Sequence, residues 1–171
     1  MRHTSTFLGL LVAATMIVNA ASDARQCQPV EGKANSTIVP QFSNGDLCAS
    51  PIGLCTEGRF TGAMNGPFVF TASSVTPIAA LDPEAPPDMA TVTGVLTATP
   101  NGLCDGTVTF ADTSVFSLSA DGSFCTVFTV TGSTGGCQGL TGRVRMQGLF
   151  VGGCVDCRYE GQVCRVAPSA E

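Results

Sequence analysis

Residues 128–148 read FTVTGSTGGCQGLTGRVRMQG, and this stretch decides the fold that we predict for the chain. It begins with the alternation of apolar and polar residues that is typical of a β-strand, is interrupted by glycines, and then resumes the alternation. Glycines permit positive φ angles and close backbone approach, which a sharp corner between two strands requires. A flexible linker would not have strand-like patterning on both sides. We therefore expect two strands joined by a corner that contains Gly132, Gly135, Gly136, Gly139 and Gly142.

The same stretch resembles a known family. Residues 130–142 follow the pattern V-T-G-x-x-G-x-x-x-G-x-x-G, and R-V-R comes directly after them. This pattern is similar to the glycine-rich corner of the allene oxide cyclase-like barrels, a superfamily that also holds the plant dirigent proteins. The resemblance implies a closed barrel, often a homo-oligomer, that shapes a cavity around hydrophobic oxylipins or phenolic radicals without a cofactor. The family usually has an aromatic residue where this chain has Cys137, which makes that position a candidate disulfide position.

The first residues have the pattern of an export signal. A short positive start is followed by an apolar run over 7–18 and by small residues over 18–21, which suit signal-peptidase cleavage. We therefore predict a signal peptide at 1–21 and a secreted, extracellular protein, or a periplasmic one in a bacterium. No other apolar run approaches the length of a membrane span. The rest divides into an irregular, disulfide-tethered arm at 22–54, a β-barrel domain at 55–166 and a tail at 167–171.

Nine cysteines follow the predicted cleavage point. In an exported chain this density predicts up to four disulfides, with one thiol left over. The sequence leaves the connectivity open. Cys154 and Cys157 form a C-x-x-C pair, but a redox motif would need a helix there and a zinc site would need a second pair, so we favour structural disulfides. The candidates are Cys27, Cys48, Cys55, Cys104, Cys125, Cys137, Cys154, Cys157 and Cys164.

Several function classes are excluded by composition. The only histidine is His3, inside the predicted signal peptide, so a histidine nucleophile system, a histidine-ligated metal and a histidine general base are ruled out. We predict no metal and no cofactor. Without Arg2 the mature chain has seven basic and thirteen acidic residues, and the basic ones are scattered along the sequence. Nucleic acid and anionic membrane surfaces are therefore not expected as partners.

The sequence from residue 56 onward reads as a series of short strands separated by turns. No window outside the signal peptide has an apolar period of 3.6, so we predict an antiparallel sandwich or a closed barrel. The glycine corner favours a barrel of about eight strands, which encloses side chains with room for one small ligand. The predicted strands cover residues 57–62, 67–75, 91–99, 107–120, 123–131, 143–150 and 156–166.

Asp112 is the first candidate for chemistry. In an unbroken strand, Asp112 and Ser114 would share the inward parity of Phe110 and Phe116, and a buried carboxyl with a raised pKa is a candidate acid or base. Residues 111–114, Ala-Asp-Thr-Ser, are also typical of a surface turn, which is the interpretation that the residue types favour.

Tyr159 is the second candidate, because it is the only phenol in the chain and lies on the apolar parity of the last predicted strand. It is either a core tyrosine or a hydrogen-bond donor to a ligand or an oxyanion.

A polar stripe follows the glycine corner and consists of Arg143, Arg145 and Gln147. We interpret it as a solvated outer face of the strand, and the alternative is that these side chains bind an anion inside the barrel. Asn35 begins an N-S-T glycosylation acceptor pattern.

Two functional hypotheses follow. The first is a secreted, disulfide-stabilised, non-catalytic barrel that binds a small apolar ligand or a partner. A small apolar ligand would lie in its phenylalanine-lined interior. The alternative is a cofactor-free cyclase or isomerase, or a dirigent-like protein, acting on a hydrophobic oxylipin or phenolic substrate. In the alternative, Tyr159 would be the hydrogen-bond donor and Asp112 the acid or base.

Overall fold

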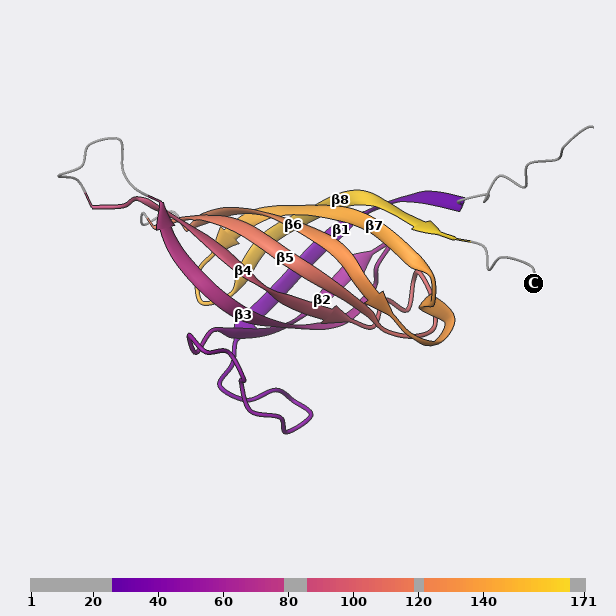
Figure 1. The fold of residues 1–171 in the computed structure, drawn as a ribbon, viewed down its shortest axis with the longest axis horizontal. Coiled ribbons are helices and arrows are strands. Elements are labelled where there is room, and N and C mark those ends of the chain that lie inside the picture. The colour runs from indigo at the N-terminus through magenta and orange to yellow at the C-terminus, as the bar shows by residue number, and fades with distance from the viewer. Residues whose placement is uncertain (1–25, 79–85, 119–121, 167–171) are drawn as a thin grey trace, which may run out of the picture.

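Eight β-strands pair in antiparallel fashion with their neighbours and close into one barrel, because the last strand pairs with the first (Figure 1). The structure is a computed structural model that describes residues 26–78, 86–118 and 122–166, so the predicted signal peptide and tail lie outside the described residues. The predicted all-β barrel of about eight strands is confirmed. The strands are β1 (Gln26–Ile38), β2 (Cys55–Gly62), β3 (Gly66–Ile78), β4 (Met89–Ala98), β5 (Val108–Ser117), β6 (Ser123–Ser133), β7 (Leu140–Phe150) and β8 (Cys154–Arg165).

The prediction of an irregular arm over 22–54 is wrong for residues 26–38, which form β1 and join the barrel by pairing with β2 and β8. Pro29 is a residue type that indicates a turn. It lies in the part of β1 that pairs with β8 alone, where a strand without a second neighbour tolerates the missing N–H. Residues 26–38 therefore belong to the barrel wall.

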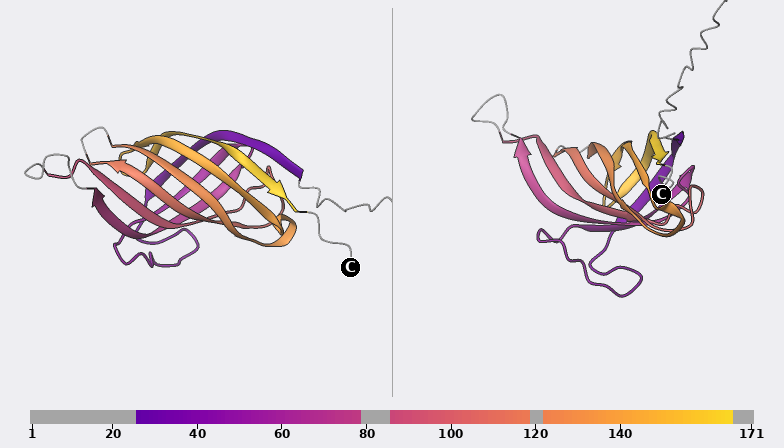
Figure 2. Two further views of the ribbon diagram at one scale, coloured as in Figure 1. Left: turned by 45° about the horizontal axis from the view of Figure 1, so that its top comes forward. Right: turned by 45° about the vertical axis from the view of Figure 1, so that its right-hand side comes forward.

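The two ends of the barrel differ. Strands β1, β3, β5 and β7 finish at one end, from which residues 39–54 extend as a loop; we call this the loop end. At the opposite end, the terminal end, Gln26 is the register partner of Arg165, so the two ends of the described chain lie side by side (Figures 1 and 2). Within the described residues, no helix has the length and apolar character that crossing a bilayer requires.

The glycine-rich stretch connects β6 to β7 at the terminal end through a single 3₁₀ turn, Gly135–Cys137. Gly135 and Gly139 have φ angles of 57° and 79°, a region that residues with a Cβ rarely adopt. A Cβ on Gly135 would also lie 2.9 Å from the carbonyl oxygen of Asp105. The corner thus requires glycine for both its backbone angles and its close contact with the loop between β4 and β5.

Four cysteine pairs lie at disulfide distance, and Cys125 is the one free cysteine among the nine, all of which are described. The predicted count of bridges is confirmed. The C-x-x-C residues bond to each other, and Cys137 in the corner bonds to the loop before β5. The pairs are Cys27–Cys164, Cys48–Cys55, Cys104–Cys137 and Cys154–Cys157.

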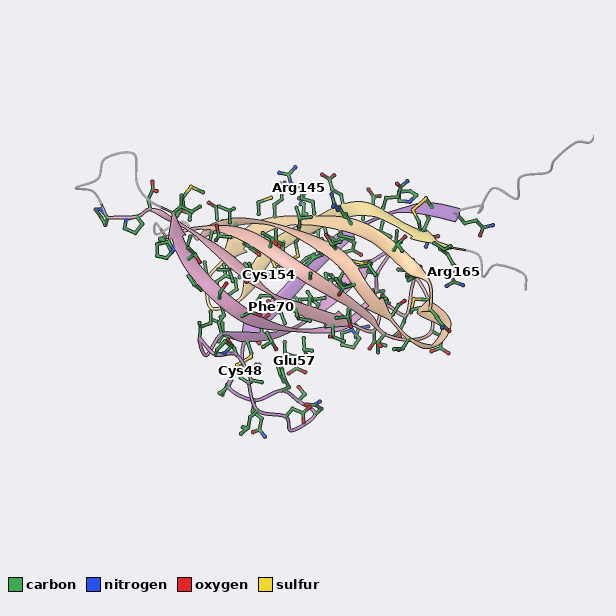
Figure 3. The ribbon with its side chains drawn as sticks, in the orientation of Figure 1. Cys48, Glu57, Phe70, Arg145, Cys154 and Arg165 are labelled. Carbon is green, nitrogen blue, oxygen red and sulfur yellow. A yellow bond between two sulfur atoms is a disulfide. The ribbon has the colours of Figure 1, made fainter. Side chains whose placement is uncertain are left out.

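The loop over 39–54 is fastened to the barrel by more than its disulfide. The backbone amide and the hydroxyl of Ser43 donate hydrogen bonds to Glu57 Oε2 at 3.0 and 2.6 Å. The hydroxyl of Ser50 donates to the carbonyl of Ala72 on β3 at 2.6 Å. Figure 3 shows Cys48 and Glu57 where the loop meets the barrel wall.

Apolar side chains fill the barrel toward the terminal end. Met64, in the turn between β2 and β3, is only 1% exposed. The ring of Phe60 lies 4.4 Å from that of Phe68 and 5.2 Å from that of Tyr159, measured between centroids. Leu140 is also buried at this end. The interior near the terminal end is therefore a packed hydrophobic core.

Candidate functional site

A pocket with a phenylalanine-rich lining lies inside the loop end of the barrel. The free space inside it is about 40 Å³. Figure 3 shows two of its lining residues, Phe70 and Cys154, within the outline of the barrel. We call it the phenylalanine pocket, and its lining residues are Ser36, Thr56, Phe68, Phe70, Leu96, Asp112, Ser114, Phe116, Phe124, Thr126, Phe128, Met146, Phe150 and Cys154.

Three aromatic rings pack together toward the loop end of this pocket. The rings of Phe116 and Phe124 stack with centroids 5.0 Å apart. The ring of Phe150 meets both edge-on, at 5.3 Å from Phe116 and 6.2 Å from Phe124. Phe116 and Phe150 are only half-buried. Phe116 is the second-last residue of β5 and Phe150 the last of β7, so these two half-buried rings lie at the loop end of the pocket.

A fourth ring depends on a glycine in the neighbouring strand. Phe70 of β3 packs over Gly94 of β4, and a Cβ on Gly94 would lie 2.5 Å from its ring. The missing side chain thus gives the phenyl ring its place inside the barrel. Gly94 is also the register partner of Asp112 on β5, so the smallest residue of β4 faces the one acidic residue of the pocket.

Asp112 lies within β5 and is 4% exposed, so the interpretation of residues 111–114 as a surface turn is wrong. Its register partners, Gly94 on β4 and Phe128 on β6, continue the sheet on both sides. The hydroxyl of Ser114 donates to Asp112 Oδ2 at 2.7 Å, and the hydroxyl of Thr126 donates to Oδ1. The carboxyl therefore faces the interior with a hydrogen bond to each oxygen.

Burial raises the pKa of the Asp112 carboxyl from 3.8 to about 6, although the hydroxyls of Thr126 and Ser114 act in the opposite direction. No lysine, arginine or histidine lines the pocket within the part of the chain that the structure describes. Asp112 is also the only Asp, Glu, Lys or Arg in strands β3 to β6. The carboxyl is therefore an isolated ionisable group inside an apolar wall.

The raised pKa of Asp112 predicts that the folded protein loses stability as the pH rises from about 4 to about 6. In this window the folded carboxyl keeps its proton, while the same carboxyl in the unfolded chain has released it. Because the native state binds more protons, this group lowers the free energy of unfolding by about 2 to 3 kcal/mol across the window and adds no further change above it. Urea unfolding of the wild type and of Asp112→Asn at several pH values measures the difference. Identical pH profiles of the two proteins would contradict the prediction.

Tyr159 lies outside the phenylalanine pocket. Its ring is 2% exposed, and its hydroxyl donates to the carbonyl of Thr61 and accepts from the amide of Met64, both at 2.9 Å. Thr61 lies near the end of β2 and Met64 lies in the turn between β2 and β3, both at the terminal end. The structure therefore does not bring Tyr159 and Asp112 together around the pocket, and the phenol instead satisfies buried backbone groups.

We expect Tyr159→Phe to lower the free energy of unfolding by about 1 to 3 kcal/mol, because it leaves the buried amide of Met64 without an acceptor. Ligand binding in the phenylalanine pocket is expected to stay unchanged, since Tyr159 does not line it. Thermal or urea unfolding measures the first effect, and a binding titration measures the second. A loss of binding by the folded variant would place the phenol in the site after all.

The polar stripe on β7 faces outward. Arg143, Arg145 and Gln147 are exposed, as expected for a solvated outer face. The guanidinium of Arg145 donates from Nε to Cys125 Sγ at 3.3 Å and from a terminal nitrogen to Gln147 Oε1 at 3.0 Å. Figure 3 shows Arg145 on the outer surface of the barrel. An anion bound by this stripe inside the barrel is therefore excluded.

Three polar pocket residues, Ser36, Thr56 and Thr126, were missed by the sequence analysis. Thr126 lies between Phe124 and Phe128 and shares their inward parity, so alternation could have found it. Ser36 belongs to β1, a strand in a segment that the local sequence predicts to be irregular. Among the described residues no group of three or more histidine, cysteine, aspartate or glutamate side chains is arranged to hold a metal ion.

Comparison with protein-family models, with curated proteins and with solved structures found no match to this chain.

Proposed function

We propose that this protein is an exported, non-catalytic barrel that binds a small, mainly apolar molecule in the phenylalanine pocket. The observation that carries the proposal is the pocket itself, in which phenyl rings surround one buried carboxyl. Binding sites for small molecules typically combine an apolar lining with very few polar groups that fix the orientation of the ligand. The signal-peptide pattern at 1–21 and the four disulfides support export to an oxidising compartment, outside the cell or in a periplasm.

Ligand entry requires ring movement. The free space of about 40 Å³ is much smaller than the several hundred Å³ typical of pockets for drug-sized ligands. Phe116 and Phe150 are half-buried and stand at the loop end, so rotation of these rings about their side-chain bonds would enlarge the pocket without breaking the sheet. The proposal therefore includes an induced opening at the loop end.

A cofactor-free cyclase or isomerase, or a dirigent-like role, is the second candidate function. It is supported by the resemblance of residues 128–148 and by the pKa of about 6 for Asp112, which lets one carboxyl act as acid or base near neutral pH. Binding without turnover is better supported, because acid–base chemistry usually needs a second convergent group. The hydroxyl of Tyr159, the proposed partner, is engaged at the terminal end.

The first test is native mass spectrometry of the secreted, oxidised protein, followed by organic extraction of any molecule that travels with it. We expect a mass above that of the chain and an apolar compound in the extract. A titration with N-phenyl-1-naphthylamine, an uncharged apolar fluorophore, is expected to saturate at one probe per chain. A protein that is empty and shows no saturable probe binding would overturn the proposal.

A matched pair of variants on β5 locates the site. Ser114→Val replaces the hydroxyl on the interior face by two methyl groups, which takes up part of the free space and removes a hydrogen bond to Asp112, whereas Thr113→Val replaces a hydroxyl by a methyl group on the exposed face of the same strand. We expect Ser114→Val to weaken probe binding by about tenfold and Thr113→Val to leave it unchanged. Equal effects of the two variants, with both folded by circular dichroism, would place the binding site elsewhere.

A further inference from the structure

We propose that the ligand of the phenylalanine pocket carries a primary amine, and that its ammonium group pairs with the carboxylate of Asp112. This inference names the chemical class of the ligand and rests on the proposed function. It follows from three properties of the pocket: a carboxyl without a cation of its own, a wall of phenyl rings, and a small space beside them.

The first property is the missing counter-ion. A carboxylate removed from water is costly unless a positive charge or strong hydrogen bonds compensate it. Two hydroxyl donors, from Ser114 and Thr126, are the only polar side-chain partners of Asp112 among the described residues. Its cross-strand neighbours Gly94 and Phe128 are uncharged. A ligand that brings a cation would supply the charge that the protein does not.

The other walls of the pocket add no competing charge. Strand β1 contributes Ser36, β2 contributes Thr56, and β7 contributes Met146 and Phe150. Strand β8 contributes Cys154, which is held in a disulfide and does not titrate. Among the described residues that line the pocket, Asp112 is therefore the only titrating side chain offered to a ligand.

The second property is the aromatic wall. The face of a phenyl ring carries partial negative charge and attracts cations, with an energy that grows when water is excluded. Six phenyl rings line the same pocket as the carboxylate, and each ring that presents its face to the ligand favours a cation over an anion. These rings are Phe68, Phe70, Phe116, Phe124, Phe128 and Phe150.

The third property is size. A space of about 40 Å³ accepts a group of a few heavy atoms, since a single water needs roughly 10 to 15 Å³ on the same measure. A primary ammonium group with its first carbon is small enough for this space, and a bulkier quaternary ammonium head would need a larger movement of the rings. The apolar remainder of the ligand would then lie between Phe116 and Phe150 at the loop end, where the rings must move for entry.

Charge pairing also fixes how binding depends on pH. An alkylammonium group stays protonated well above neutral pH, as a lysine side chain does. The carboxyl must lose its proton to pair with it, so affinity for an amine should rise with pH through about 6, the pKa of Asp112, and level off above it. Affinity for an uncharged ligand of the same shape should lack this rise.

The test compares three ligands of equal chain length with the secreted, oxidised protein: hexylamine, 1-hexanol and hexanoate. At about pH 7.5 we expect calorimetry to give the tightest binding for hexylamine, at least about tenfold tighter than for 1-hexanol, with hexanoate weakest. The preference for the amine should shrink at about pH 4.5, where Asp112 is protonated. Asp112→Asn should remove the preference and still bind 1-hexanol, whereas Asp105→Asn, on the exposed loop before β5, should change nothing.

The outcomes separate the two proposals. If 1-hexanol binds as tightly as hexylamine, or if folded Asp112→Asn keeps the preference for the amine, the amine inference is overturned and the apolar binding function stands. If none of the three ligands binds, and N-phenyl-1-naphthylamine does not bind either, both proposals fail. The pH profile of the wild-type chain decides the question even if Asp112→Asn does not fold.

Discussion

Removing the disulfide between Cys27 and Cys164 is expected to lower the free energy of unfolding by about 5 kcal/mol. This bridge links residues that are 137 positions apart, so its loss releases nearly the whole barrel in the unfolded chain. In the chain-entropy description, the stabilisation grows with the logarithm of the closed loop and reaches about 5 kcal/mol for a loop of this length. Urea unfolding of the Cys27→Ser, Cys164→Ser double variant measures the loss.

The matched control is the Cys48→Ala, Cys55→Ala double variant. These cysteines are only seven positions apart, and the same description gives a loss of about 2 to 3 kcal/mol. The difference between the two double variants therefore tests whether loop length decides the contribution of each bridge. Equal losses would show that local contacts of the cysteines, and not the constraint on the unfolded chain, determine their effect.

The second large effect is expected for Phe60→Ala, which should cost about 3 to 5 kcal/mol of unfolding free energy. Phe60 is 1% exposed, and its ring contacts those of Phe68 and Tyr159 in the packed half of the barrel. Removing the ring leaves a cavity that the rigid strands around it fill only in part. Chemical denaturation gives the magnitude.

Val95→Ala is the control for this core substitution. Val95 lies on the outer face of β4 and is 45% exposed, so truncation removes little buried surface and should cost less than about 1 kcal/mol. A cost for Phe60→Ala as small as that for Val95→Ala would mean that the interior near the terminal end is loosely packed.

Much of the fold could be predicted because it depends on local patterns. The glycine corner and the alternation on both sides of it gave β6 and β7, and period-two patterns gave the other strands from β2 to β8. β1 was missed because Pro29 is a turn signal, and only Val30 and Ala34 are buried apolar residues in its length. That strand exists because of its long-range pairing with β2 and β8, which a local pattern does not contain.

The site was predictable only in part, for a similar reason. The alternation of β5 predicts that Asp112 faces the interior, whereas the residue types Ala-Asp-Thr-Ser favour a surface turn. The strand forms because β5 pairs with β4 and β6, and this pairing is not contained in the local sequence. The role of Tyr159 depends on the turn before β3, 95 residues away from it. Cys27 and Cys164 are register partners, so their bond follows from the alignment of the first and last strands, which the spacing of cysteines does not reveal.

The buried carboxyl and the surrounding rings together explain why one residue dominates the proposed chemistry. Four consecutive strands, β3 to β6, carry a single charged residue, and it faces the interior. Any ligand that enters from the loop end therefore meets an apolar wall first and one ionisable group beyond it. The selectivity of the pocket then depends on whether the ligand carries a positive charge that compensates the carboxylate of Asp112.

Gln26 and Arg165 lie side by side, so the protein can be attached to another object from one end of the barrel. A tag, a solid support or a neighbouring domain joined next to Gln26 or Arg165 attaches at the terminal end, where the disulfide between Cys27 and Cys164 holds both strands together. The phenylalanine pocket lies toward the other end of the barrel. Immobilised in this way, the protein presents its pocket to the surrounding solution, which is the orientation that a capture surface or a biosensor requires.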